Sequence, residues 1–253
     1  RGHEVMLYEK GTKLGGLIPL AAVVKDLEND DLMALIQYYK IQLDQLGVRV
    51  KLGKEVDTTA VEEFKPDVLI LACGGVPNNL DIPGSNRDNV LNSSELHKLL
   101  RSYMRFLGPK MLSRLTKCWM PIGKRAIVIG GTIIGCELAE FLTKRRRKVT
   151  IVHRDDELGA GMIKDDRLRL IPWLEKKGTT IFTGTTYHEI TEQGLVITTR
   201  EGKKKTLEAD TIMVALHLLP DTNTTKSLEG KARETYTIGD CREPQMMPQA
   251  VAD

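Results

Sequence analysis

The sequence is poor in cysteine. Only four of its 253 residues are cysteines, Cys73, Cys118, Cys136 and Cys241, and no two of them form a C-x-x-C pair. This excludes a small disulfide-stapled protein and indicates neither a cysteine zinc site nor a dithiol redox pair. His-rich clusters and H-E-x-x-H motifs are also missing, so we expect no metal site.

Long hydrophobic runs and an excess of one charge are missing as well. No stretch approaches the roughly 18 apolar residues that span a bilayer, and the opening residues carry no signal-peptide pattern. The 37 basic and 34 acidic residues give a net charge of +3, too balanced to favour a nucleic-acid partner. We therefore expect a cytoplasmic protein with neither a nucleic-acid nor a membrane partner. No G-x-S-x-G is present, and we assign no catalytic side chain.

What is present is the pattern of an α/β protein. A strand-like segment covers residues 4–10, and the continuous apolar run 67–72 is typical of a strand buried in a parallel sheet. Residues 125–130, 133–146 and 148–153 read as a complete βαβ unit. The short segment 236–240 cannot stand alone, so we expect it to return to the first sheet. The fold class is α/β, with two Rossmann-like domains, the second inserted in the first.

The breaks in composition set the predicted boundaries. Prolines and glycines interrupt residues 78–124, which we interpret as a linker or crossover. The predicted domains are a first nucleotide-binding domain over 1–77, a second over 125–222, and a return to the first domain over 223–253.

A dinucleotide fingerprint lies between the strand 125–130 and the helix that follows it. It reads Gly130-Gly131-Thr132-Ile133-Ile134-Gly135, and its glycines permit a tight turn and close packing of helix and strand. Thr132 replaces the second glycine of the motif. Its side chain either crowds a pyrophosphate or donates a hydrogen bond to it. The alternative is a Rossmann unit that keeps the fold without binding a nucleotide.

His153 and Arg154 end the second strand of this unit, where a ribose-binding carboxylate is usual. The Arg154 guanidinium either pairs with a 2′-phosphate, which favours NADP over NAD, or forms a solvated ion pair with Asp155 or Asp156. The basic run 144–148 is interpreted as a solvated helix end, with a docking patch as the alternative.

Several motifs, taken in order, resemble one family. The sequence is similar to the C-terminal module of the NADH:flavin oxidoreductase, 2,4-dienoyl-CoA reductase and trimethylamine dehydrogenase family, which is old yellow enzyme-like. The similarity covers nearly the whole chain and rests on Arg1-Gly2-His3-Glu4-Val5-Met6-Leu7-Tyr8-Glu9-Lys10, Leu14-Gly15-Gly16, Ala72-Cys73-Gly74-Gly75-Val76-Pro77, Ile82-Pro83-Gly84, Gly130-Gly131 through Glu137, and Ile238-Gly239-Asp240-Cys241.

The resemblance implies cofactors and residues that bind them. It implies FAD, or ADP in its place, together with NADP or NAD, and a parent protein whose N-terminal barrel carries FMN and a 4Fe-4S cluster. Glu9 would then bind the adenosine ribose, and Gly239 and Asp240 would approach the ribityl and pyrophosphate groups. The other residues that the resemblance places at this cofactor are Lys10, Gly15, Gly16, Ala72, Gly74 and Gly75.

The sequence departs from this family at both ends and inside. It begins after the family's first strand and glycine-rich turn, and it carries His217 where glycine is usual. We expect an oxidoreductase fragment, inactive by itself, whose parent passes electrons from NAD(P)H through FAD to reduce an activated alkene. The alternatives are a non-catalytic module that holds ADP or nothing, and a stand-alone reductase of the ferredoxin or glutamate synthase type. The expected partners are pyridine nucleotide, flavin and the barrel, and a homo-oligomer is compatible with the sequence.

Overall fold

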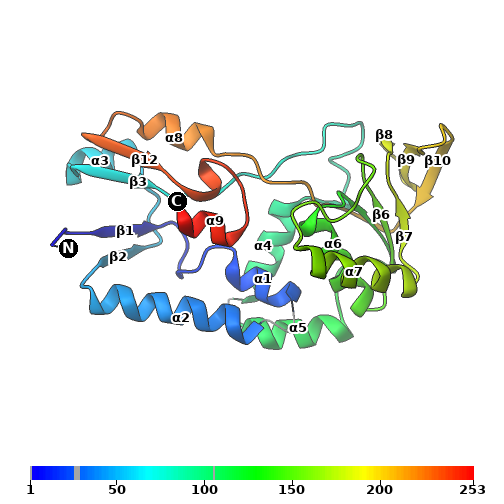
Figure 1. Ribbon diagram of the computed structural model, residues 1–253, viewed down its shortest axis with the longest axis horizontal. Coiled ribbons are helices and arrows are strands. Elements are labelled where there is room, and N and C mark those ends of the chain that lie inside the picture. Colours follow the sequence, from blue (N-terminus) through cyan, green and yellow to red (C-terminus); the bar gives the residue numbers. More distant parts are fainter. Residues whose placement is uncertain (1, 26–28, 105) are drawn as a thin grey trace. The chain divides into compact units, whose positions relative to one another are not determined.

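A computed structural model describes residues 2–25, 29–104 and 106–253 (Figure 1). Arg1, which opens the first motif above, lies outside the described residues. The chain forms two compact units. The first contains residues 1–76 and 218–253, and the second contains residues 77–217. The stretch 78–124, predicted as a linker, is therefore part of the second unit, and it contains two helices.

The first unit is built from short parallel strands and helices. Its elements are β1 (Met6–Glu9), α1 (Ile18–Lys25), α2 (Asn29–Gln45), β2 (Arg49–Leu52), α3 (Thr58–Phe64), β3 (Val68–Leu71), α8 (Thr222–Leu228), β12 (Glu234–Thr237), η1 (Gly239–Cys241) and α9 (Met247–Ala252). Strand β1 pairs with β2, and β3 pairs with β12, both in parallel register. The chain thus returns to this unit through β12, with Leu71 opposite Thr237.

Local capping and a small core hold the β3–β12 half together. Asp57 caps α3, because its Oδ1 accepts a hydrogen bond from the amide of Ala60 over 2.8 Å. Behind the strands, the buried core consists of Val61, Leu71, Leu228 and Cys241. Other apolar side chains of these strands stay in solvent: Val68 is 45% and Ile70 is 59% exposed. The prediction that the run 67–72 is buried was therefore wrong for most of β3, because among the described strands β3 pairs only with β12 and its faces are not fully covered. The core of this half is accordingly small.

The second unit contains a five-stranded parallel sheet and a three-stranded antiparallel sheet. Its elements are β4 (Val90–Leu91), α4 (Ser93–Met104), α5 (Pro109–Cys118), β5 (Arg125–Ile129), α6 (Ile133–Lys144), β6 (Lys148–Val152), α7 (Lys164–Lys176), β7 (Thr180–Phe182), β8 (Thr186–Ile190), β9 (Gly194–Thr198), β10 (Lys204–Glu208) and β11 (Thr211–Val214). The parallel order is β4-β11-β5-β6-β7, and the antiparallel order is β10-β9-β8.

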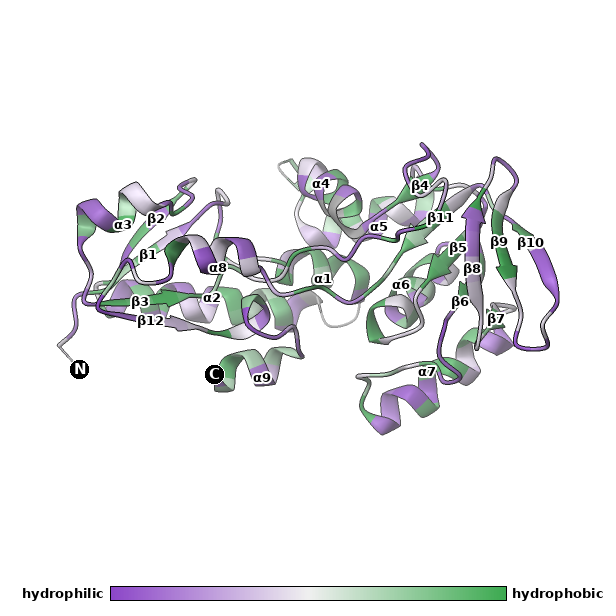
Figure 2. Ribbon diagram, turned by 90° about the horizontal axis from the view of Figure 1, so that it is seen from above, coloured by the Kyte–Doolittle hydropathy of each residue, from purple (hydrophilic) through white to green (hydrophobic). Residues whose placement is uncertain are grey.

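The core of the second unit lies on β5 and β11. Four of the five residues of β5 are buried, as are all four of β11, which is typical of strands covered on both faces. Figure 2 shows the hydrophobic β9 beside the hydrophilic β10. Strands β8 and β10 were not predicted, because their exposed positions carry polar residues such as His188 and Lys204.

One residue of the basic run is buried, which corrects its interpretation as a solvated helix end. Arg145 is only 2% exposed, and its guanidinium lies 3.5 Å from the centroid of the Phe141 ring. Its nitrogens donate to Thr116 Oγ1 over 2.8 Å and to the carbonyl and hydroxyl oxygens of Ser113 over 3.1 and 3.0 Å. The arginine therefore fixes α5 against the end of α6.

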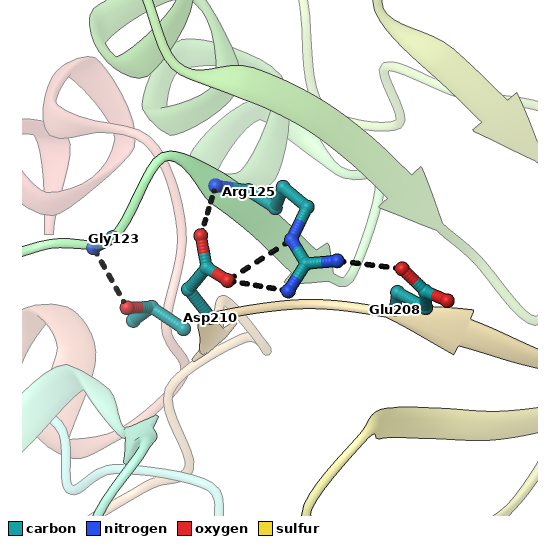
Figure 3. A network of polar contacts seen from close by, with 5 residues as sticks. Gly123, Arg125, Glu208 and Asp210 are labelled. Atoms are coloured by element: carbon teal, nitrogen blue, oxygen red, sulfur yellow. Dashed lines mark hydrogen bonds and ion pairs between the residues drawn. The ribbon is translucent and has the colours of Figure 1, made fainter.

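An ion-pair network joins the beginnings of β5 and β11 (Figure 3). The Arg125 guanidinium donates twice to Asp210 Oδ1, over 2.9 and 2.6 Å, and once to Glu208 Oε2 over 2.6 Å. The backbone amide of Arg125 donates to the other Asp210 oxygen over 2.8 Å. Hydrogen bonding to Arg125 lowers the pKa of Asp210 below its usual value. Because the Asp210 carboxylate is partly exposed to solvent, the network adds little to the stability of the fold and mainly positions the beginnings of β5 and β11.

Within the described part of the chain, none of the helices combines the length and the apolar character needed to cross a bilayer.

Candidate functional site

The fingerprint turn joins the end of β5 to the start of α6. Gly130 has a φ of +112°, and its amide donates to the carbonyl oxygen of Val152 over 2.9 Å. A Cβ on Gly130 would lie 2.4 Å from the carbonyl oxygen of Ala215, which directly follows the neighbouring strand β11. Both the positive φ and the close approach require glycine here.

The other two glycines of the fingerprint are required by packing. A Cβ on Gly135 would lie 1.8 Å from the carbonyl oxygen of Gly130, so the first turn of α6 approaches the end of β5 very closely. A Cβ on Gly131 would lie 2.2 Å from Leu158 Cδ2. The turn is therefore a tight cradle with the N-terminus of α6 behind it, which is the geometry that favours bound phosphate.

Thr132 occupies the N-cap position of α6 and is only 8% exposed. Its hydroxyl is buried and has no hydrogen-bond partner among the residues that the structure describes. A buried hydroxyl without a partner is unfavourable, and a phosphate oxygen at the turn would satisfy it. The glycine cradle and this hydroxyl thus fit a dinucleotide phosphate, and they favour the hydrogen-bonding alternative for Thr132 over simple crowding.

His153 follows β6 and faces the fingerprint turn. It is 6% exposed, and its Nδ1 accepts a hydrogen bond from the amide of Gly131 over 3.1 Å. Burial lowers the pKa of His153; the nearby carboxylate of Asp155 opposes this shift, and His217 adds to it. His217, which stands where the family usually has glycine, is therefore close enough to His153 to affect its pKa.

Arg154 is exposed beside His153 and lies over the ring of Tyr187, 5.1 Å from its centroid. The two carboxylates that the sequence offered as its partners pair with other residues. Asp155 Oδ2 lies 3.4 Å from His153 Nε2, and Asp156 Oδ1 lies 3.7 Å from Arg200 Nε. The Arg154 guanidinium therefore stays exposed at the carboxyl end of the sheet. Nucleotides bind at this end of the sheet in Rossmann-like folds.

Sequence reasoning did not identify Tyr187 and Leu158 as parts of this site. The Tyr187 hydroxyl donates to the carbonyl oxygen of Val152 over 3.1 Å, and burial raises the pKa of this tyrosine to about 12. Leu158 is 5% exposed and packs against Gly131. Neither residue belongs to a recognisable motif, and both reach the turn only through the tertiary structure.

In the first unit, the predicted nucleotide residues lie after the carboxyl ends of strands. Glu9 ends β1, and its Oε1 accepts a hydrogen bond from the amide of Gly11 over 2.6 Å. Lys10 Nζ lies 4.0 Å from Glu55 Oε1. Gly15 and Gly16 have φ values of +120° and +54°, and a Cβ on Gly15 would lie 2.8 Å from Ile36 Cδ1.

A second group of predicted residues follows β3 and β12. Because these strands pair in parallel, Ala72, Gly74 and Gly75 lie at the same sheet edge as Gly239 and Asp240. Gly74 and Gly239 have positive φ values of +81° and +62°. The amide of Gly239 donates to the Asp253 carboxylate over 2.9 Å, and Asp240 Oδ1 accepts from the amide of Gln245 over 3.2 Å.

Cys73 follows β3 and Cys241 follows β12, so the two cysteines come together at this edge although they are far apart in the sequence. The Cys241 thiol donates to the carbonyl oxygen of Leu71 over 3.0 Å. Burial, with a smaller effect of Cys241, raises the pKa of Cys73 to about 11. Among the described residues, no group of three or more His, Cys, Asp or Glu side chains is placed to hold a metal ion.

Comparison with known proteins gives a match over the full chain. The family model described as pyridine nucleotide-disulphide oxidoreductase matches residues 1–253. The chain is 28% identical over 245 residues to an NADH oxidase from Thermoanaerobacter brockii, covering 95% of this chain and 34% of the relative. It is 27% identical over 254 residues to a cinnamate reductase from Clostridium sporogenes, covering 99% of this chain and 35% of the relative.

Solved structures agree with these relatives. The structure of a 2-naphthoyl-CoA reductase in complex with 2-naphthoyl-CoA is 28% identical, with a TM-score of 0.83, and is matched over 100% of this chain and 35% of its own length. A NAD-dependent persulfide reductase from A. fulgidus, at 20% identity and a TM-score of 0.60, shares the fold. These findings confirm the resemblance drawn from the motifs and the α/β, Rossmann-like fold class. The chain spans about a third of the length of the relatives it matches.

Proposed function

We propose that this chain, which belongs to the pyridine nucleotide-disulphide oxidoreductase family, receives electrons from NADPH at its second unit and holds FAD at its first. The observation that carries the proposal is the fingerprint turn, where glycine is required by close packing and the buried Thr132 hydroxyl lacks a partner among the described residues. The family match supports binding of FAD and NAD(P) in general terms.

The proposed roles of the chain's own residues are binding and orientation. Residues 130–135 cradle the pyrophosphate at the N-terminus of α6, and the exposed Arg154 binds the 2′-phosphate that distinguishes NADP from NAD. In the first unit, Glu9 accepts hydrogen bonds from the adenosine ribose, and Gly239 and Asp240 approach the ribityl and pyrophosphate groups. When bound, the nicotinamide supplies a hydride and the flavin accepts it, so no side chain need act as an acid or base.

The substrate of the intact protein is proposed to be an activated alkene. Two relatives are named as reductases of cinnamate and of 2-naphthoyl-CoA, both of which are unsaturated acyl compounds. Because this chain spans about a third of their length, we place FMN, a 4Fe-4S cluster and the alkene site in a barrel of the parent protein. The relatives' names support the alkene substrate, and their greater length supports a further domain in the parent protein.

A second candidate function is a non-catalytic module that holds ADP or nothing. It is favoured by the hydrogen bonding of the fingerprint turn, where two amides already have partners within the chain. The amide of Gly131 donates to His153 Nδ1, and the amide of Ile133 donates to the carbonyl oxygen of Ala160 over 3.0 Å. In this alternative the turn is a structural element of the fold.

Calorimetric titration of the full chain with NADP⁺ and NAD⁺ tests the proposal. We expect NADP⁺ to bind more tightly than NAD⁺, and Arg154→Ala to weaken NADP⁺ about tenfold, the size expected for a charge-assisted hydrogen bond. Lys204→Ala, an exposed cation on β10, is the matched control and should change neither affinity. Absence of binding by folded protein, or ADP without flavin released on denaturation, would support the non-catalytic module instead.

A further inference from the structure

The helices α4 and α5 of the second unit carry a strong local excess of positive charge. We call residues 93–119, which contain both helices, the α4–α5 pair (Figure 1). Its sequence has six Lys or Arg residues and a single acidic residue, Glu95. The Glu95 carboxylate accepts a hydrogen bond from the amide of Asn92 over 3.0 Å, at the beginning of α4. The near balance of charge over the whole chain therefore hides this basic segment.

One side of the pair is packed into the second unit. Ser113 and Thr116 of α5 are buried and accept hydrogen bonds from the guanidinium of Arg145, at the end of α6. The rings of Tyr103 and Trp119 lie edge to face, with their centroids 6.4 Å apart, and join the two helices. The pair is therefore held in place by the unit itself, and only its outer side can contact a partner.

The outer side carries large apolar side chains in solvent. Phe106, between the two helices, is 89% exposed, and Met111 and Trp119 are 61% and 56% exposed. Met111, Leu115 and Trp119 follow one another at four-residue spacing, so they form one stripe along α5. Single exposed apolar residues are ordinary on a protein surface, whereas a continuous apolar patch marks an interaction site.

Cations run along α5 beside this apolar stripe. Lys110, Arg114 and Lys117 are exposed and are separated by four and three residues, which places them on one line of the helix. On α4, Lys98 and Arg101 are exposed and lie three residues apart. The helix α5 therefore has a packed face, a cationic face and an exposed apolar face.

This combination of faces fits a partner that is both apolar and negatively charged over a broad surface. A bilayer with anionic headgroups has phosphates for the cations and acyl chains for the apolar stripe, and amphipathic basic helices bind such surfaces in the plane of the membrane. Aromatic side chains such as Phe106 and Trp119 are suited to the level of the headgroups. A protein that encloses a target helix in a groove fits less well, because one face of α5 is already packed against Arg145.

We propose that the α4–α5 pair docks the second unit onto the surface of an anionic phospholipid bilayer. Phe106, Met111 and Trp119 enter the interface, and the exposed Lys and Arg side chains face the lipid phosphates. The inference is independent of the proposed nucleotide function, because no residue of the fingerprint turn takes part in it.

Flotation of the full chain with lipid vesicles tests the proposal. We expect the protein to float with vesicles of equal parts phosphatidylcholine and phosphatidylglycerol. Vesicles of phosphatidylcholine alone should bind it at least about tenfold more weakly, because they attract no cations. Binding to the anionic vesicles should weaken as salt is added, since salt screens exposed charges.

Matched variants locate the contact on the α4–α5 pair. The double substitution Phe106→Ser and Met111→Ser removes two side chains that are mostly in solvent, and should weaken binding to anionic vesicles by about tenfold or more. Leu46→Ser, at a 75% exposed leucine of the first unit, is its control. Arg114→Gln should weaken binding about fivefold, whereas Lys204→Gln, at an exposed cation of β10, should leave it within about twofold. Circular dichroism checks that each variant is folded.

The fluorescence of Trp119 gives a direct readout of insertion. The chain has two tryptophans, Trp119 and Trp173, so Trp173→Phe leaves Trp119 as the only one. We expect its emission to shift to shorter wavelength when anionic vesicles are added, and lipids brominated in their acyl chains to quench it.

Three results would overturn the inference. The first is that folded protein does not float with anionic vesicles at low salt. The second is that the double variant binds as well as the unsubstituted protein and the emission of Trp119 does not change, which would place the contact on another surface. The third is a dimer in sedimentation equilibrium that the double variant converts to a monomer, because a second copy of the chain would then cover the apolar stripe.

Discussion

The carbonyl oxygen of Gly130 lies where a Cβ on Gly135 would approach it to 1.8 Å, so α6 begins in closer contact with the end of β5 than any side chain permits. This contact sets the distance between the helix N-terminus and the sheet. It also places Thr132 and Ile133 at the turn between them.

Gly135→Ala should therefore disrupt the turn. We expect the free energy of unfolding to fall by about 3 kcal/mol, the size of an overpacking effect in a rigid core, and NADP⁺ affinity to fall with it. Urea denaturation followed by circular dichroism measures the change. Gly108→Ala is the matched control, because nothing lies within 4 Å of its Cβ position and its φ is −69°. Equal stability of the two variants would contradict the close approach.

Arg145→Met tests the buried guanidinium. The substitution removes the donors to Ser113 and Thr116 while keeping much of the apolar stem that packs on Phe141. We expect a loss of about 3 kcal/mol, since buried polar groups of α5 are left without their partner. Lys148→Ala, in the same basic run but exposed, should change stability by less than about 0.5 kcal/mol. If urea denaturation showed similarly small changes in the free energy of unfolding for both variants, the interpretation of the basic run as a solvated helix end would stand.

The stability of the protein should depend on pH through His153. Its pKa in the folded state is lowered by burial from the ordinary 6.5, so the unfolded state binds the proton more readily. Stability from this residue is constant above pH 6.5 and decreases as the pH falls from 6.5 toward the lowered folded-state pKa.

His153→Asn removes the titrating group while keeping the acceptor for Gly131, so the variant should lose less stability on acidification than the unsubstituted protein. Urea denaturation at a series of pH values measures the difference between the two curves, in which the contributions of all other groups cancel. Parallel curves from neutral to mildly acidic pH would show that the ring does not titrate at a lowered pKa.

Cys73 should be accessible but unreactive. It is exposed, yet its pKa is raised to about 11 by burial of its sulfur and by Cys241. Because the thiolate is the reactive form, alkylation near neutral pH should be roughly a hundredfold slower than for an ordinary thiol of pKa about 8.5. Mass spectrometry after iodoacetamide treatment should show the exposed Cys118 modified first. Cys241→Ala should accelerate labelling of Cys73, and an unchanged rate would mean that the neighbouring thiol has no influence.

Much of the fold follows from local sequence pattern. The βαβ unit was predicted correctly because apolar strands, a helical segment and an intervening glycine turn are all encoded within about thirty residues. Strands β8 and β10 were missed, since Thr186–Ile190 and Lys204–Glu208 carry polar residues on their exposed faces and gain their apolar partner only in β9. The hydrophobic pattern of one segment does not show which strand it will pair with.

The sequence by itself determined the family, the glycine turn at 130–135 and the presence of His153 and Arg154 after the second strand, because these depend on residue identity and short spacing. Only the tertiary structure decided that Arg145 is buried, that Cys73 meets Cys241, and that the amide of Gly131 donates to His153 Nδ1. Each of these contacts joins residues that are neighbours in space through packing of separate elements. Hydrogen-bond partners and burial, which determine charge state, are properties of that packing and are not encoded in local pattern.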